Sequence, residues 1–237
     1  MDWTRYDAAL FDLDGVVTPT AIVHMRAWSE MFNAFLATRG VTEPYTDADY
    51  FAHVDGKPRY DGVRSFLASR DIVLPEGDPT DGPDAETVAG LGNRKNAAFM
   101  EVLHRDGMQA YPGSLHLLDH LTTLGTKVAV VSSSQNARPV LEAAGLIDRF
   151  PVIVDGLVAR QEGLPGKPAP DTFLAAAARL GVAKERAVVL EDAESGVAAG
   201  RAGDFGLVIG VDRGAGVEAL TRNGADLVVS DLDELVK

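Results

Sequence analysis

The chain has no cysteine among its 237 residues, so disulfides, zinc–thiolate sites and cysteine nucleophiles are excluded. It lacks an apolar run long enough to cross a bilayer. Its first residues also lack the charged and apolar regions of a signal peptide. We therefore expect a cytoplasmic location and no membrane partner.

Positive charge is scarce, with 22 Lys and Arg against 35 Asp and Glu, which gives a formal net charge of −13. Long-range attraction to nucleic acid is therefore not expected. An acidic protein that binds a phosphate ester must attract it with local cations. The positions of individual lysines, arginines and metal ions thus matter more than the total charge.

Short apolar runs alternate with helix-like stretches after residue 127, which predicts a parallel sheet with right-handed crossovers. The expected fold is α/β, a Rossmann-like parallel sheet core with helices on both faces. The predicted strands are Ala8–Phe11, Lys127–Val131, Val152–Val154, Ala187–Leu190, Gly206–Val211 and Ala225–Val229. The predicted helices of this part are Ala137–Ala144, Pro170–Leu180, Glu194–Ala202 and Val217–Arg222.

The chain between about Thr20 and Arg105 shows no buried strand, and its patterns are amphipathic and helical. We expect a small helical cap domain at residues 19–106, inserted after the first strand of a core domain at residues 1–18 and 107–237. Hinges are expected near residues 18–21 and 107–112, and such inserts can close over a substrate. The predicted helices are Val23–Arg39, Arg59–Ser69 and Glu86–Arg105.

Two carboxylates, Asp12 and Asp14, directly follow the predicted first strand. Like charges this close repel one another and raise each other's pKa unless a cation lies nearby. A hard divalent cation with oxygen ligands removes that cost, and the cation we expect is Mg²⁺. The alternative is a strand that ends in an ordinary Asp-Gly turn.

Three later segments carry polar groups at or near predicted strand ends. Ser132 could bind a phosphate oxygen or cap a helix. Lys167, in Gly-Lys-Pro-Ala-Pro-Asp, could neutralise a phosphoryl group or be an exposed surface lysine. Glu191 and Asp192 could be metal ligands or an acidic helix start.

These four segments, in this order, resemble the four motifs of the haloacid dehalogenase-like superfamily, and the helical insert resembles its mobile cap. The resemblance implies that Asp12 is the nucleophile that forms an aspartyl phosphate and that Asp14 is the general acid/base. It implies that Ser132 and Lys167 bind the transferring phosphoryl oxygens. The implied ligands of Mg²⁺ are Asp12, Asp14 through its backbone carbonyl, Glu191 and Asp192.

The insert resembles the cap of the β-phosphoglucomutase subfamily in the runs Thr20–Trp28, Gly56–Arg59 and Asn93–Asn96. This resemblance implies a role for Arg59 in binding the phosphate that is not transferred. The other implied substrate-binding residues are Thr20, His24, Trp28, Lys95, Ser134 and Asn136.

The implied reaction interconverts β-D-glucose 1-phosphate and glucose 6-phosphate through β-glucose 1,6-bisphosphate, in a protein expected to be a monomer. The alternative is a sugar-phosphate phosphatase on the same scaffold. Pro19 stands where these families usually carry aspartate. Gln135 stands where β-phosphoglucomutases often carry lysine, which favours the phosphatase.

Three other classes receive less support. The segment Gly214–Ala219 formally fits a dinucleotide-binding fingerprint, but too little chain follows it to complete the βαβ unit. A phosphate-binding module without catalysis would not need two acids facing an anion. The chain has no Gly-x-Ser-x-Gly elbow for acyl transfer.

Overall fold

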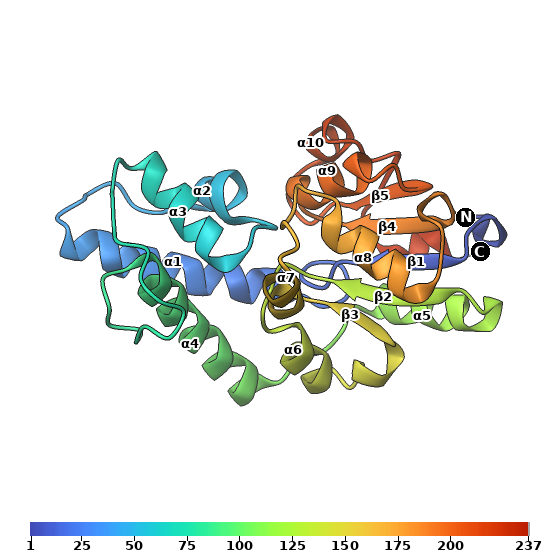
Figure 1. Cartoon of the computed structure of the whole chain (residues 1–237), viewed down its shortest axis with the longest axis horizontal. Helices are drawn as coiled ribbons and strands as arrows, with labels where there is room; N and C mark the ends of the chain where they lie inside the picture. The colour runs from blue at the N-terminus through green and yellow to red at the C-terminus, as the bar shows by residue number, and fades with distance from the viewer. Residues whose placement is uncertain (237) are drawn as a thin grey trace. The chain divides into compact units, whose positions relative to one another are not determined.

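A six-stranded parallel sheet forms the centre of one of two compact units in the computed structural model, which describes residues 1–236 (Figure 1). This unit comprises Met1–Thr20 and the chain from Met108 onward, and Ala21–Gly107 forms the other. The strand order β3-β2-β1-β4-β5-β6 confirms the predicted Rossmann-like α/β fold. The strands are β1 (Ala8–Phe11), β2 (Lys127–Val131), β3 (Val152–Val154), β4 (Ala187–Glu191), β5 (Leu207–Val211) and β6 (Leu227–Val229).

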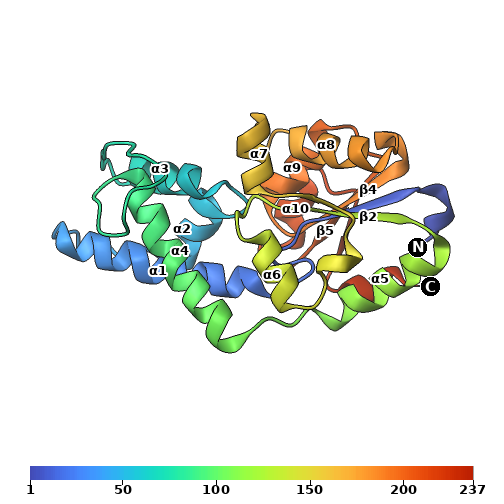
Figure 2. The same ribbon diagram turned by 60° about the horizontal axis from the view of Figure 1, so that its bottom comes forward.

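Helices cover both faces of this sheet, which is why β1 and β4 are buried along their whole length. Figure 2 shows α8 and α9 on one side of the strands and α5 and α6 on the other. Phe173 of α8 packs with Leu10 and Val189 on the first side, and Phe11 meets Phe150 edge-on at 5.9 Å. The helices are α5 (Pro112–Leu124), α6 (Ala137–Ala143), α7 (Gly156–Glu162), α8 (Asp171–Leu180), α9 (Glu194–Ala202) and α10 (Val217–Arg222).

The register of the central strands aligns their carboxyl ends, because Phe11 of β1 pairs with Val130 of β2 and with Leu190 of β4. The strand order runs outward in both directions from β1, so a topological switch point lies between β1 and β4. Open α/β sheets bind their ligands in the crevice at such a point. Asp12 and Glu191 therefore meet where a ligand is expected.

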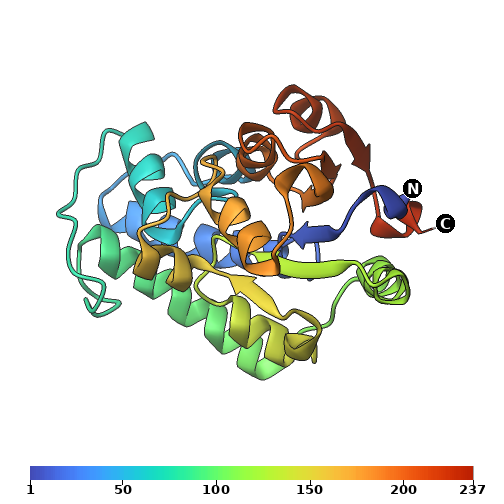
Figure 3. The ribbon, with the colours of Figure 1, turned by 45° about the vertical axis from the view of Figure 1, so that its right-hand side comes forward.

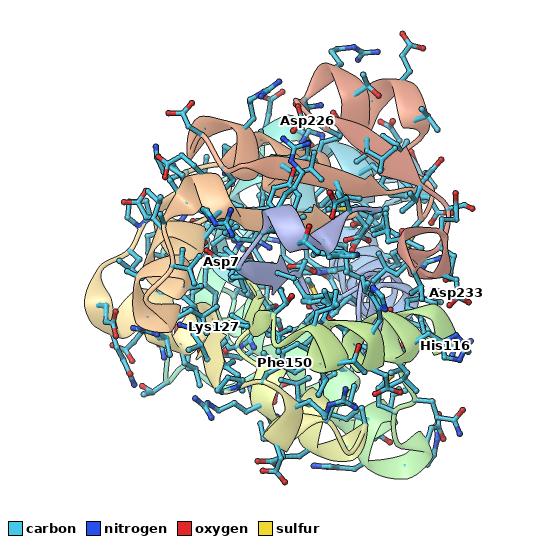
Figure 4. All side chains as sticks on the ribbon, turned by 90° about the vertical axis from the view of Figure 1, so that its right-hand side faces the viewer. Asp7, His116, Lys127, Phe150, Asp226 and Asp233 are labelled. Atoms are coloured by element: carbon cyan, nitrogen blue, oxygen red, sulfur yellow. The ribbon has the colours of Figure 1, made fainter. Side chains whose placement is uncertain are left out.

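The opposite end of the sheet holds both chain termini. The Trp3 indole N–H donates to the carbonyl of Leu235 at 3.1 Å, and Figure 3 shows the two ends side by side. Figure 4 views this end, where Asp7 and Lys127 mark the beginnings of β1 and β2. Since it lies at the amino ends of the strands, this face is remote from Asp12.

The second unit is helical and has its own aromatic core. Phe32 stacks on Trp28, with ring centroids 5.2 Å apart, and also contacts Tyr45 and Phe66. Such clusters combine large apolar burial with favourable ring geometry. The elements are α1 (Thr20–Thr38, whose first residue belongs to the sheet unit), α2 (Asp47–Asp49), a π-helix (Tyr50–Val54), α3 (Arg59–Ser69) and α4 (Val88–Asp106).

Two helices of the sheet unit were not predicted. Helix α5 opens with Pro112 and Gly113, which resemble a turn, but a proline at the first helical position fits a helix start. Helix α7 has only seven residues, and the Asp155 side chain caps its first amides.

Element boundaries also differ from the prediction. Strand β6 begins at Leu227, because the Ala225 amide bonds back to Leu220 and closes α10. Helix α4 begins at Val88, because the Thr87 hydroxyl caps it. No helix within residues 1–236 is both long and apolar enough to cross a membrane.

Candidate active site

Lys167 and Asp12 form the centre of the candidate site in the sheet unit. The Lys167 ammonium donates to Asp12 Oδ1 and to Glu191 Oε1, both at 2.5 Å, and to the carbonyl of Val131 at 3.0 Å. Its side chain is 1% exposed. All three ammonium protons thus have acceptors from three neighbouring strand ends, which fixes the amine in one position.

The charges of this cluster do not balance. Asp12, Asp14, Glu191 and Asp192 bring four carboxylates to one ammonium. Burial raises the pKa of the Asp12 carboxyl well above its usual value, and Glu191 and Asp14 add to this, while Lys167 opposes it. Burial opposes the charged form of Lys167, but Asp12 and Glu191 outweigh it and raise the Lys167 pKa. The excess negative charge favours a bound cation.

Three acidic side chains have the geometry for such a cation. Asp12, Glu191 and Asp192 are buried, and one oxygen of each lies within 4.8 Å of the others. Oxygen ligands of this kind suit a hard divalent ion. Glu191 Oε2 also accepts the amide of Ala193 at 2.9 Å, which fixes the Glu191 carboxylate plane. Three of the four predicted ligands therefore meet through their side chains.

Asp14 is oriented by hydroxyl groups. Thr20 Oγ1 donates to Asp14 Oδ1, and Ser132 Oγ lies 3.3 Å from Asp14 Oδ2. Thr18 Oγ1 lies 2.8 Å from Thr20 Oγ1, and both threonines are fully buried. Sequence reasoning missed Thr18, although a threonine two residues before Thr20 in an otherwise apolar turn is a signal that could have found it.

Ser134 lies in the loop between β2 and α6, and Asn136 directly precedes α6. The Ser134 hydroxyl accepts the Asn136 amide at 3.1 Å, and the Ser134 amide donates to Ser132 Oγ at 3.0 Å. These bonds form local turns that precede the helix. Ser134 is therefore bonded to Ser132, and Asn136 is bonded to Ser134.

Three predicted cap residues form a separate cluster within the helical unit. Lys95 Nζ bonds to His24 Nδ1, and it lies 5.0 Å from the Trp28 ring centroid. The His24 ring stacks on Phe99 with centroids 4.1 Å apart. Lys95 is 3% exposed. The amine of Lys95 is thus enclosed by aromatic rings and by the His24 imidazole.

Arg59, the predicted ligand of the second phosphate, begins α3. Its Nη2 donates to Asn96 Oδ1 of α4 at 2.7 Å. The helices approach closely here, because a Cβ at Gly92 would lie 2.8 Å from the Tyr60 ring. Arg59 and Lys95 are therefore held on the same helix pair.

Glycines that shape the site were also missed. Gly15 has φ +94°, and a Cβ there would overlap the Asp192 carboxylate. A Cβ at Gly196 would overlap the Glu191 carboxylate. In both cases a missing side chain makes room for a candidate metal ligand. An Asp-Gly pair after a strand was visible, but it was equally consistent with a simple turn.

Comparisons with known proteins agree with this geometry. A model of the haloacid dehalogenase-like hydrolase family matches residues 6–204. The chain is 54% identical to a β-phosphoglucomutase of Mycobacterium tuberculosis over 97% of this chain and 91% of that protein. It is 30% identical to hexitol phosphatase A of Escherichia coli, over 98% and 94%. A crystal structure of β-phosphoglucomutase from Clostridium difficile matches with TM-score 0.76 and 25% identity, over 97% and 93%.

Proposed function

Because this chain belongs to the haloacid dehalogenase-like hydrolase family, we propose that it transfers phosphoryl groups between positions of a sugar phosphate through Asp12. The proposed reaction interconverts β-D-glucose 1-phosphate and glucose 6-phosphate through β-glucose 1,6-bisphosphate. The observation that carries the proposal is the pair of aspartates at the end of β1, one held by Lys167 and the other by Thr20. The relative from Mycobacterium tuberculosis supports the choice of reaction.

Asp12 acts as the nucleophile in this proposal. A phosphoryl group carried on its carboxylate passes to the 6-hydroxyl of glucose 1-phosphate, and Asp14 takes the hydroxyl proton. The bisphosphate then turns over. Asp12 attacks the phosphorus at C1, and Asp14 returns the proton to the leaving oxygen. The net change is isomerisation, and the aspartyl phosphate is regenerated.

Lys167 and Ser132 have positioning roles in this scheme. Lys167 holds Asp12 in place and supplies positive charge where the transferring oxygens gather. Ser132 Oγ lies 3.3 Å from Asp14 Oδ2, and we propose that it binds the same phosphoryl oxygens. We propose that Asp12, Asp14 through its carbonyl, Glu191 and Asp192 hold Mg²⁺, which would neutralise phosphoryl charge when bound.

A mutase needs a second site for the phosphate that is not being transferred. We assign this role to Arg59, whose planar guanidinium suits bidentate phosphate binding. Lys95, His24 and Trp28 are proposed to contact the sugar, with Thr20, Ser134 and Asn136 completing the set. The Lys95 amine is buried on α4, which pairs with the α3 helix that carries Arg59, so the two basic side chains lie on one helix pair.

A sugar-phosphate phosphatase is the second candidate. The 30% identity to hexitol phosphatase A favours it, as does the uncharged Gln135 after the second motif. In that case water would attack the aspartyl phosphate, and no second phosphate site would be needed.

The test is ³¹P NMR of the purified protein with Mg²⁺, β-glucose 1-phosphate and a trace of β-glucose 1,6-bisphosphate. We expect glucose 6-phosphate without matching inorganic phosphate. Stoichiometric inorganic phosphate would instead support the phosphatase. The Asp12→Asn variant should be inactive in both cases, which identifies any contaminating activity.

A matched pair of variants tests the second phosphate site. Arg59→Ala should slow the mutase and raise the KM for the bisphosphate. Arg26→Ala, which removes an exposed arginine from α1 of the same unit, should leave both unchanged. Equal behaviour of the two variants would contradict the role assigned to Arg59.

A further inference from the structure

The loop after β5 carries the glycine pattern that formally fits a dinucleotide-binding fingerprint. In the structure, Asp212 Oδ1 accepts the amides of Gly214 and Gly216, each at 3.0 Å. The amides that would bind a phosphate in such a fingerprint are therefore bound by the chain's own carboxylate. The loop is a fixed turn, and its remaining prominent side chain is Arg213.

Arg213 contacts three other segments of the same unit. Its Nε donates to the carbonyl of Gly15 at 2.9 Å, and Nη1 donates to the carbonyl of Ser230 at 2.9 Å. The guanidinium carbon lies 4.0 Å from the centroid of the Tyr111 ring, and Asp231 forms an ion pair at 3.6 Å. Only a planar group with several fixed donors can make these contacts together.

The turn that Arg213 holds directly follows the catalytic aspartates. Three successive carbonyls of this turn are fixed by donors from outside it. The carbonyl of Gly15 accepts from Arg213. The carbonyl of Val16 accepts from the Ser114 hydroxyl at 2.6 Å, and the carbonyl of Val17 accepts from the Tyr111 amide at 3.0 Å. Of these three, the Gly15 bond is made by a charged side chain, and charge-assisted bonds are the stronger kind.

Gly15 links this turn to the candidate metal ligands. Its amide donates to the Thr18 carbonyl at 2.7 Å, its φ is +94°, and its α-carbon faces the Asp192 carboxylate. The peptide that contains this amide also contains the carbonyl of Asp14. A shift of Gly15 would therefore displace the Asp14 carbonyl and the Asp192 carboxylate together.

We propose that Arg213 is a positioning residue for the metal site, because it fixes the Gly15 turn against Asp192 and orients the Asp14 carbonyl. The inference rests on the proposed function only in taking Mg²⁺ as the ion. It assigns a role to a residue that lies 199 positions after Asp14 in sequence and outside the four motifs.

The experiment compares Mg²⁺ binding by calorimetry in the wild type, Arg213→Lys and Arg213→Gln, with Arg222→Gln as control. Arg222 is an exposed arginine of neighbouring α10 that pairs with Glu218. Both Arg213 variants should bind Mg²⁺ about ten- to a hundredfold more weakly, as expected for a partner that orients a metal ligand. Saturating Mg²⁺ should restore most of kcat, and the KM for the sugar phosphate should stay unchanged.

A purely structural role would give a different result. If the Arg213 variants have a lower Tm but bind Mg²⁺ as the wild type does, the proposal is wrong. Arg213→Lys keeps the positive charge, so we expect it to fold even if Arg213→Gln does not. Far-UV circular dichroism would show whether each variant is folded. A wild type that binds Mg²⁺ without turning over sugar phosphate would refute the proposed function, but the calorimetric comparison would still decide the role of Arg213.

Discussion

Replacing Lys167 with Met tests the central feature of the site. The substitution keeps most of the side-chain volume and removes the ammonium that bonds to Asp12 and Glu191. Both carboxylates stay buried, and no other Lys or Arg is paired with either of them in residues 1–236. Removing one partner of a buried ion pair costs about 3–5 kcal/mol, because an uncompensated charge is left behind.

The expected loss can be measured by thermal unfolding without added metal. For a chain of this size, 1 kcal/mol corresponds to about 2–4 °C in Tm, so Lys167→Met should unfold about 6–20 °C lower. Lys184→Met is the matched control. Lys184 pairs at the surface with the exposed Asp204, so its loss should cost less than about 1 kcal/mol.

The pH dependence gives a second criterion. Burial, with the neighbouring carboxylates, raises the folded-state pKa of Asp12 above the unfolded value of 3.8. Ionised Asp12 therefore destabilises the folded state, and this cost disappears as the pH falls through the raised pKa toward the unfolded one. The difference between Lys167→Met and the wild type should shrink as the pH approaches about 4. A difference that equals the Lys184→Met control, or that does not depend on pH, would refute the reasoning.

Three further predictions concern the turn after β1 and the cap. Gly15→Ala should cost about 1–2 kcal/mol in backbone strain and weaken Mg²⁺ binding by displacing Asp192, measured by denaturation and calorimetry. Thr18→Val should cost about 1 kcal/mol and lower kcat more than it changes KM, whereas unchanged kcat would contradict the hydroxyl contact with Thr20. Partial burial raises the Asp49 pKa, but the hydrogen bonds from Thr46 outweigh it and lower the pKa below 3.8. Asp49→Asn should therefore destabilise the folded protein at pH 7, and the loss should shrink as the pH falls below 3.8. Urea unfolding measures this loss.

Much of the sheet could be predicted because its signals are local. Runs such as Ala187–Leu190 are apolar without interruption, which is typical of strands covered on both faces. Helix α5 was not predicted, because its first residues, Pro112 and Gly113, favour a turn when they are considered alone. Its helical state also depends on tertiary contacts, such as the bond from the Ser114 hydroxyl to the carbonyl of Val16, 98 residues earlier.

The meeting of Asp12, Glu191 and Asp192 could be predicted for a similar reason, since strand ends are recognisable and parallel strands bring their carboxyl ends to one edge. Their roles, the cap assignments and the monomeric state stay predictions that experiment must decide. The sequence could not supply the direction of each side chain. The orientation of Asp14 toward Thr20 and Ser132 depends on a contact across 118 positions.

The loop at Gly214–Gly216 shows why a short motif needs its structural setting. A glycine-rich turn after a strand provides free amides for a phosphate only if no nearer anion takes them, and here Asp212 does. Arg213, which lies between Asp212 and Gly214 in this turn, donates its own hydrogen bond to the carbonyl of Gly15. In this chain the glycine-rich segment therefore binds no dinucleotide phosphate in our interpretation. Its neighbour Arg213 instead fixes the Gly15 turn beside the proposed metal site. The decisive residue is the aspartate that precedes the glycines, which the fingerprint does not include.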